Sequence, residues 1–203
     1  MSDEQLKILR QGSKVWNEWR RNNCEKGLCN KVDLSGADLS GADLAEVDFI
    51  AANLPGANFT GANLRGANLD DAILDGVNFS GANLHNARLM CTILRGANLS
   101  KASLVMAILI NADLREADFA DANLRGANFG GANLSMANFA GAKLRGTNFP
   151  GANLTEADIR TALEFSSAYH IGLAKWTRAK LTNRQKRKID SALYESRKIA
   201  RAE

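Results

Sequence analysis

Aspartate and asparagine offer most of the chemistry in this sequence, and they recur at a fixed spacing. Asp33, Asp38, Asp43 and Asp48 follow one another every five residues, and asparagines continue the series. Paired carboxylates act as general acid and base only when distinct surroundings separate their two pKa values. Side chains that repeat in identical settings lack this distinction. The carboxylates therefore indicate a structural or surface role and not an active site.

Few other residues are candidates for catalysis or metal binding. The two histidines, His85 and His170, have no sequence neighbours at the spacing of a triad or a metal motif, and no GxxxxGK[ST] loop occurs. Cys24 and Cys29 lack a nearby histidine, which disfavours a zinc site. Since the first residues are charged throughout and do not form an export signal, we expect both thiols to be reduced and the protein to be cytoplasmic. We expect no enzymatic activity, no metal and no cofactor.

Large apolar residues follow the same five-residue period. From Leu34 to Ile159, the centre of each unit is Leu, Phe or Ile at 26 consecutive positions, and the residue two before it is Ala in 21 of them. A five-residue step turns a helix by about 140° and alternates the faces of a strand, so neither element alone buries this series. The pattern predicts short strands that end in corners. The centre and the small residue then face inward, and the residue between them faces outward.

Two further regularities describe the corners and sides. Glycine is frequent at the second position after the centre, where it eases a turn. Centres at positions ending in 4 are always leucine, whereas phenylalanine occurs only at positions ending in 9. The alternation predicts a coil with an even number of sides. A fixed period of this kind is typical of a solenoid, whose units are stable only when stacked.

Units such as ADLSG and ANLRG resemble the A(D/N)LXX repeats of the pentapeptide-repeat proteins over residues 32–162. The resemblance implies an all-β solenoid, a right-handed quadrilateral parallel β-helix with four units in each coil. We expect α-helical flanks at both ends. Residues 1–31 would form an N-terminal helical cap, residues 32–162 the β-helix, and residues 163–203 a linker and a basic C-terminal helix.

The flanking segments carry helix signals. Leu6, Leu9, Trp16 and Trp19 form an apolar stripe along a helix predicted over residues 3–21, and we expect the tryptophans to pack toward the first coil. Capping boxes stand at residues 2–5 and 182–185.

The C-terminal segment is strongly basic. Four cations lie in the first two turns of its predicted helix, where they oppose the helix dipole. Binding of an anionic partner, such as nucleic acid, and a solvated helix face both explain them. These residues are Arg184, Lys186, Arg187 and Lys188.

Most outward positions of the repeat carry polar or small residues, but some carry large apolar residues. If four units make a coil, these apolar residues stack into a patch midway along the rod. A patch on an otherwise polar surface is typical of a contact site. Three explanations stay open: a homodimer or protein partner, cover by the C-terminal segment, and β-branched residues that merely suit a strand. The residues are Ile73, Met90, Ile93, Val105, Met106, Ile108 and Ile110.

Two functions follow from these features. The first is a protein-binding or scaffold role that presents flat solenoid faces to a protein partner of unknown identity. The alternative is implied by the resemblance: some family members imitate DNA and bind type II topoisomerases such as gyrase. Asp33, Asp38, Asp43 and Asp48 would form an acidic ring suited to that role, although arginines elsewhere interrupt the negative surface. The N-terminal segment is similar to leaders of bacterial members of the family.

Overall fold

Residues twenty positions apart pair with each other throughout the repeat. Asp33 forms a parallel bridge with Asn53. The Leu34 N–H donates to the Asn53 carbonyl, and the Asn53 N–H donates to the Val32 carbonyl, each with 2.9 Å between N and O. One turn of the coil therefore stacks on the next through backbone hydrogen bonds. The computed structural model describes residues 3–24, 32–165, 171 and 174–199.

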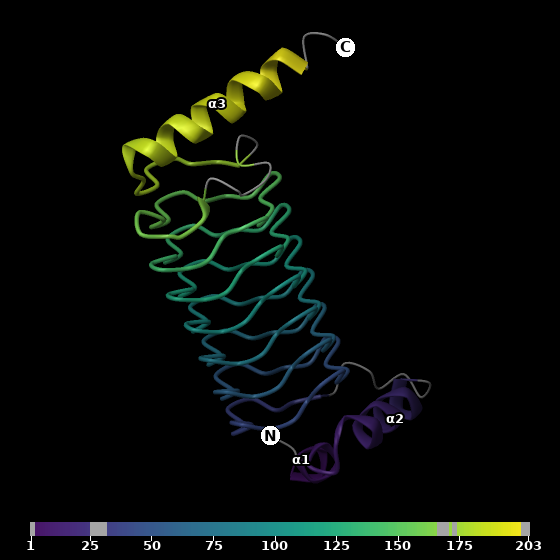
Figure 1. Cartoon of the computed structure of the whole chain (residues 1–203). Helices are drawn as coiled ribbons and strands as arrows, with labels where there is room; N and C mark the ends of the chain where they lie inside the picture. Colours follow the sequence, from purple (N-terminus) through teal and green to yellow (C-terminus); the bar gives the residue numbers. More distant parts are fainter. Residues whose placement is uncertain (1–2, 25–31, 166–170, 172–173, 200–203) are drawn as a thin grey trace.

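Each coil has four sides, and the coils stack into a rod (Figure 1). Every fifth residue is bridged, so each side adds one bridged residue to a column that runs along the rod. We name the sides by these columns. Side A runs from Asp33 to Asn153, side B from Asp38 to Asp158, side C from Asp43 to Leu163 and side D from Asp48 to Asn148.

The sides are shorter than the strands that the repeat predicts. Among the described residues, each side contributes an isolated bridge, and no longer strand forms. The cause is the spacing of the corners, because two of every five residues belong to a turn. The bridged residue and its two neighbours are all that remains extended.

Each corner is a tight turn whose third residue has a positive φ. The Ala37 N–H donates to the Leu34 carbonyl at 3.0 Å, and Gly36 between them has a φ of 66°. These are features of a type II turn, in which glycine suits the third position. The predicted role of glycine is confirmed. Other corners place a side chain in the same conformation, as at Lys101 and Met106.

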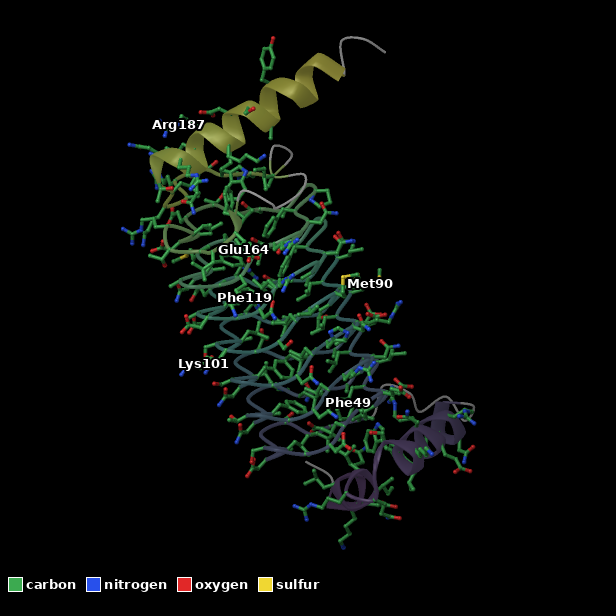
Figure 2. All side chains as sticks on the ribbon, viewed as in Figure 1. Phe49, Met90, Lys101, Phe119, Glu164 and Arg187 are labelled. Carbon is green, nitrogen blue, oxygen red and sulfur yellow. The ribbon has the colours of Figure 1, made fainter. Side chains whose placement is uncertain are left out.

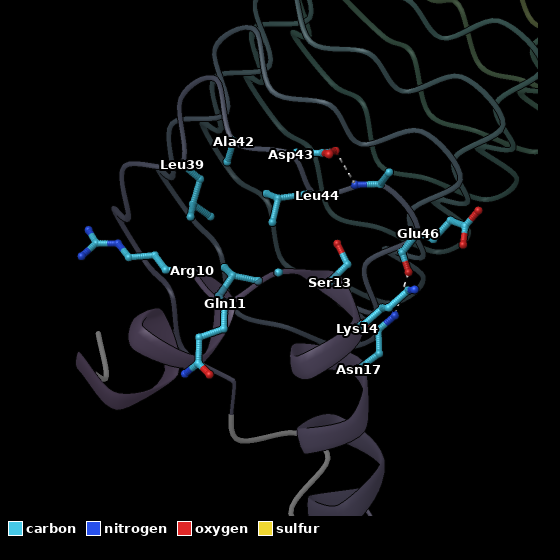
Figure 3. Close-up of a pocket in the computed structure, with 13 residues that line it drawn as sticks. Arg10, Gln11, Ser13, Lys14, Asn17, Leu39, Ala42, Asp43, Leu44 and Glu46 are labelled. Atoms are coloured by element: carbon cyan, nitrogen blue, oxygen red, sulfur yellow. Dashed lines mark hydrogen bonds between the residues drawn. The ribbon is translucent and has the colours of Figure 1, made fainter.

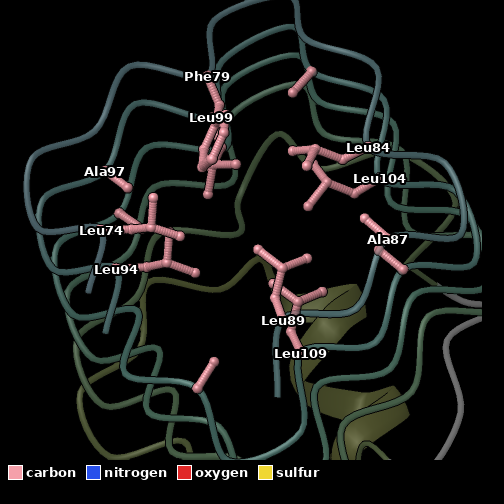
Figure 4. Packing of buried hydrophobic residues seen from close by; sticks show 14 of the residues in the cluster. Leu74, Phe79, Leu84, Ala87, Leu89, Leu94, Ala97, Leu99, Leu104 and Leu109 are labelled. Carbon is pink, nitrogen blue, oxygen red and sulfur yellow. The ribbon is translucent and has the colours of Figure 1, made fainter. Parts of the chain in front are cut away.

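Apolar side chains fill the rod in stacked columns. Figure 2 shows Phe49 and Phe119 within the coils, and Figure 4 shows Leu99 next to Phe79 of the preceding coil. The phenylalanines fall on the opposite sides B and D, as the alternation predicts. Phe119 and Phe139 stack with ring centroids 5.0 Å apart. Full burial of each such side chain contributes about 1.5–3 kcal/mol to the free energy that stabilises the fold.

Two helices lie at the N-terminal end of the rod, where the sequence predicts one over residues 3–21. α1 spans Asp3–Leu9 and α2 spans Ser13–Cys24. The break falls at Gly12, whose φ of 105° is incompatible with a continuous helix. Ser2 of the predicted capping box and Cys29 of the predicted thiol pair lie outside the described residues.

One of the two tryptophans of α2, Trp16, contacts the first coil. Buried Trp16 meets Phe49 edge-on, with ring centroids 5.6 Å apart, and Trp19 lies 5.0 Å from Trp16. The predicted packing on the first coil is thus confirmed for Trp16. Trp19 packs behind it and is half-buried.

At the other end, bridges continue past residue 162. Leu163 bridges Lys143, which keeps the spacing of twenty residues between paired positions. Asn153 instead bridges Lys175, two residues beyond that spacing. α3 spans Asn183–Ile199 and crosses this end of the rod (Figure 1).

The predicted capping box of α3 is confirmed. The Gln185 N–H donates to the Thr182 hydroxyl at 3.2 Å, and the Thr182 N–H donates to the Gln185 amide oxygen at 2.7 Å. The Gln185 amide nitrogen also donates to the Ile159 carbonyl at 2.7 Å, which ties α3 to the rod.

The positive φ at the corners predicts opposite effects for one substitution at two exposed lysines. Lys101→Gly should raise the free energy of unfolding by about 0.5–1 kcal/mol, because it removes a side chain from the left-handed region. Lys143→Gly, at a bridged position without a positive φ, should lower it by a similar amount. Urea unfolding followed by circular dichroism measures both. Equal effects in the two variants would contradict the role assigned to the corner.

Candidate interaction surfaces

The predicted apolar patch surrounds side D over the middle coils. Ile73 and Ile93 bridge each other, so the predicted stacking of these isoleucines is confirmed. Because several of its residues stand at corners, the patch extends over more than one side of the rod and is curved, not flat. Ile73 and Ile93 lie on side A, Met90 and Ile110 at the corner of sides D and A, Ile108 on side D, and Val105 and Met106 at the corner of sides C and D.

The patch is less exposed than its composition suggests. Ile73 is 39% exposed and Met106 is 56% exposed, whereas the other five residues are half-buried. The Met106 sulfur lies over Gly126 of the next coil. A Cβ atom added to Gly126 would be only 2.5 Å from this sulfur. Since coils are stacked about 4.8 Å apart, neighbours cover part of each outward side chain.

A charged pair borders the patch at the corner of sides D and A. Arg88 Nη2 lies 2.6 Å from Asp70 Oδ2 and 3.5 Å from the Met90 sulfur. The Met90 N–H donates to Asp70 Oδ1 at 2.8 Å. An apolar centre with a fixed polar rim is the usual anatomy of a protein interface. The described part of the C-terminal segment leaves the patch uncovered, because α3 lies across the end of the rod (Figure 1).

The four aspartates of the first coil form a ring with one carboxylate on each side. Asp38 and Asp43 are exposed, whereas Asp33 and Asp48 are half-buried beside the helices. Later coils carry mainly asparagine in the same columns. The ring therefore circles one end of the rod, whereas DNA phosphates would be imitated by charges along a side.

Hydrogen bonds favour the ionised forms of two members of this ring, Asp33 and Asp38. The Ser35 hydroxyl and N–H and the Asn53 amide donate to the Asp33 carboxylate, which lowers the pKa of Asp33 to about 2. Hydrogen bonds from Ser40 and from Asn58 likewise lower the pKa of Asp38. Each bond stabilises the charged form and is weakened when the carboxylate is protonated.

Arginines neutralise several aspartates farther along the rod. Because these pairs are exposed and screened by solvent, each contributes little to stability. Their main effect is to remove negative charge from sides A and B. The pairs join Arg95 to Asp75 at 2.6 Å, Arg115 to Asp113 at 2.7 Å and Arg160 to Asp158 at 2.7 Å.

The basic residues predicted to bind an anion lie in the first turns of α3. Arg184, Lys186, Arg187 and Lys188 are all exposed, while Gln185 and Ile189 between and beyond them are buried. Helical spacing gathers Arg184, Arg187 and Lys188 on one side and places Lys186 on the other. Arg184 and Lys188 also line a cavity of about 270 Å³ next to the last coil.

Side chains of α1 and α2 hydrogen-bond to the edge of the first coil, which the sequence does not predict. Asn17 accepts from the Asp48 N–H at 2.8 Å and donates to the Glu46 carbonyl at 2.9 Å. These side chains replace the backbone of a preceding coil. The same kind of contact joins Gln5 Oε1 to the Asp33 N–H at 3.1 Å, Trp16 Nε1 to the Asp48 carbonyl at 2.7 Å, and Arg20 Nη2 to the Ile50 carbonyl at 2.6 Å.

Arg20 is the available sequence signal for these contacts. It stands four residues after Trp16, on the apolar stripe of the helix, and it is only 2% exposed. Burial lowers its pKa, and the nearby Asp48 carboxylate opposes this shift. A charge on the buried face of a helix indicates a specific partner.

The helices cover sides A and D of this edge and leave sides B and C beside a groove. The groove has a volume of about 820 Å³ and separates the turn between α1 and α2 from the first coil (Figure 3). Leu39, Ala42 and Leu44 line it from the rod, and Leu9 and Ser13 line it from the helices.

Of the histidines and paired cysteines in the sequence, His170 and Cys29 lie outside the described residues. Within the described residues, no three His, Cys, Asp or Glu side chains gather as metal ligands would. His85 is half-buried at the corner of sides C and D, and Cys91 is an exposed free thiol. In the same part of the chain, no helix has the length and apolar character needed to span a membrane.

A family model described as Pentapeptide repeats matches this sequence in eight copies, over residues 29–66, 52–96, 92–131 and 132–162. A search of curated protein sequences finds no match.

Solved structures of repeat proteins are similar to this chain. A trypsin-treated form of QnrB1, a plasmid-mediated fluoroquinolone resistance protein, is 20% identical, with 80% of this chain and 95% of that chain covered and a TM-score of 0.42. The pentapeptide repeat protein Rfr23 from the cyanobacterium Cyanothece 51142 is 25% identical, with 80% and 96% covered and a TM-score of 0.40. A thylakoid-lumen pentapeptide repeat protein from Arabidopsis thaliana is 33% identical, with 68% and 71% covered and a TM-score of 0.16.

The lowered pKa of Asp33 predicts an acid-dependent loss of stability. A carboxyl whose pKa is about 2 in the folded state and about 3.9 in the unfolded chain stabilises the fold above pH 4. That contribution is lost as the pH falls from about 4 to about 2. Unfolding midpoints measured across this range should fall for the wild type and fall less steeply for Asp33→Asn. Parallel curves for the two proteins would contradict the assignment.

Proposed function

Because the chain belongs to the pentapeptide-repeat family, we propose that it is a non-enzymatic binding or scaffold protein of the cytoplasm. Its solenoid would present outer sides to a protein partner. We also propose that the coil has the right-handed sense implied by the family resemblance.

The apolar patch around side D is the observation that carries this proposal. Outward positions elsewhere on the rod are mainly Asp, Asn, Ser and Gly, whose polar or small side chains suit exposure to water. Here isoleucine, valine and methionine replace them over consecutive coils. The Arg88–Asp70 pair supplies a polar rim, and α3 lies elsewhere. An uncovered apolar surface of this kind favours a contact with another protein.

A second copy of the chain is the first partner to test. The patch wraps round a rod of nearly constant cross-section, so two rods can place equivalent patches together across a two-fold axis. Such an isologous contact needs no second surface on the protein.

Dimer formation through the patch predicts a loss of association in the double variant Ile93→Asn with Ile108→Asn. The fold should tolerate both changes, because asparagine occupies other bridged positions of the same columns: Asn128 in the coil next to Ile108, and Asn133 two coils after Ile93. Light scattering over a range of protein concentrations measures the molar mass. The wild type should be dimeric and the variant monomeric.

Lys143→Asn is the matched control for this experiment, since it changes an outward bridged position on side C away from the patch. It should leave the molar mass unchanged. If the wild type is itself monomeric, the homodimer is excluded. Capture with wild type and double variant as baits then decides whether the patch holds a different protein. Identical captured proteins would contradict any binding role for the patch.

DNA mimicry toward a type II topoisomerase is the alternative function. The acidic ring supports it at the first coil, where Asp38 and Asp43 are exposed. The paired arginines of sides A and B oppose it along the rest of the rod, since they remove charges that a phosphate mimic needs.

A supercoiling assay with purified gyrase tests this alternative directly. DNA mimicry predicts that saturating protein inhibits supercoiling or relieves a block by a fluoroquinolone. Changing Asp33, Asp38, Asp43 and Asp48 together to asparagine should abolish the effect, because the ring then carries no charge. Absence of any effect of the wild-type protein would exclude mimicry.

A further inference from the structure

We propose that the open half of the first coil's edge, on sides B and C, binds an extended peptide segment of a partner protein. The peptide would continue the coil through backbone hydrogen bonds. This site lies at the N-terminal end of the rod and is independent of the patch around side D.

The rod itself shows which bonds such a peptide would make. On side B, three backbone hydrogen bonds join the first coil to the second. They run from Leu39 N–H to the Asn58 carbonyl at 2.8 Å, from Asn58 N–H to the Ala37 carbonyl at 2.9 Å, and from Gly41 N–H to the Thr60 carbonyl at 2.8 Å.

At the opposite edge of the same coil, the equivalent groups are available. The Asp38 N–H, the Asp38 carbonyl and the Ser40 carbonyl stand where a preceding coil would bond, and the described part of the chain supplies no partner for them. Asp43 and Ala45 repeat the arrangement on side C. The two sides together offer donors and acceptors in the pattern that one half-coil of peptide requires.

The helices confirm that this edge accepts substitutes for a coil. On side D, Trp16 bonds the Asp48 carbonyl, Asn17 bonds the Asp48 N–H, and Arg20 bonds the Ile50 carbonyl. These are the positions that correspond to the Asp38 and Ser40 groups of side B. Side chains of α1 on side A and of α2 on side D therefore occupy half of the edge, and half is open.

The groove beside the open half gives room for a peptide and an apolar floor. Leu39, Ala42 and Leu44 line the groove from the rod (Figure 3), and Leu9 is among the residues that line it from the helices. Leu39 and Leu44 are already buried, whereas Ala42 is half-buried, so an inward side chain of the peptide would rest mainly on Ala42. This combination of backbone pairing and alternate side-chain pockets is the usual mode of strand addition to a sheet edge.

The shape of this end favours a peptide over a second rod. A helix with side chains is about 10 Å across, whereas stacked coils are about 4.8 Å apart. α1 and α2 on sides A and D would hold another rod too far away to pair on sides B and C. A single extended chain fits beside the helices.

Charge favours the same occupant. A second copy placed end to end would bring its own ring of four aspartates against this one. Asp38 and Asp43 already accept the amides of Asn58 and Asn63 at 3.0 and 2.8 Å. An ionised carboxylate has no hydrogen to donate, so a residue stacked beneath it must be a donor. The peptide would therefore carry asparagine, lysine or arginine at its outward positions, and not aspartate.

The test uses a peptide that reproduces one half-coil, acetyl-ANFTGANLRG-amide, whose sequence is that of residues 57–66. Titration of the ¹⁵N-labelled full-length protein, followed by nuclear magnetic resonance, should give saturable shifts at the amides of residues 38–45. The peptide acetyl-ADFTGADLRG-amide, with aspartate at both outward positions, should bind at least about tenfold more weakly. A scrambled peptide should give no saturable shift.

Two protein variants locate the site. Ser13→Trp places a large side chain in the groove, because Ser13 lines it, and should weaken binding by at least about tenfold. Val15→Trp adds the same residue to the exposed surface of α2 outside the groove and should leave binding unchanged. The double variant Ile93→Asn with Ile108→Asn should also bind normally, which separates this site from the proposed function.

Three results would overturn the proposal. One is the absence of saturable shifts at residues 38–45, and another is equal binding by Ser13→Trp and wild type. The third is a change in the chemical shifts of residues 38–45 when the protein concentration is raised without peptide, accompanied by a doubling of the molar mass of the protein. That result would assign the edge to a second copy of the chain.

Discussion

Apart from the hydrogen bonds that close the corner turns, the backbone groups of each coil find their partners in the coil before and the coil after it. Each solenoid side has a single bridged residue, and the backbone hydrogen bonds of that residue all go to neighbouring coils. Pairing from coil to coil therefore continues along the rod and stops at its two ends. The helices, the acidic ring and the open half-edge are all consequences of this constraint.

The same constraint explains why the register of the rod was readable in the sequence. One inward centre every five residues fixes which side chain is buried, and the alternation of leucine with phenylalanine at Phe49, Phe59 and Phe79 fixes the sides. Because a shift of one residue would bury an aspartate, no other register competes. The helical capping box at Thr182 was equally readable, since it depends on residues close in sequence.

Features that depend on contacts between distant segments could not be read in the same way. Asn17 and Arg20 bond a coil edge some thirty residues away, and only the bend at Gly12 brings them to it. Exposure of the apolar patch was overestimated for a related reason. The sequence places Ile93 and Ile108 outside the rod, but it does not show how far the neighbouring coils cover them. Corners with a side chain at positive φ, as at Lys101, were also unforeseen, because the stacked coils impose the turn whatever the residue.

The backbone hydrogen-bonding groups at the two ends of the rod find partners in different ways, and this difference bears on function. At the C-terminal end, the coil continues through Lys175 and Lys180, and Gln185 takes the Ile159 carbonyl. At the N-terminal end, side chains of two short helices take half of the edge and leave Asp38 and Asp43 in water. Charged residues at an exposed edge discourage uncontrolled pairing with other chains. An edge that repels its own copy but keeps its donors and acceptors free is selective, because it admits only a chain that can donate to its carboxylates.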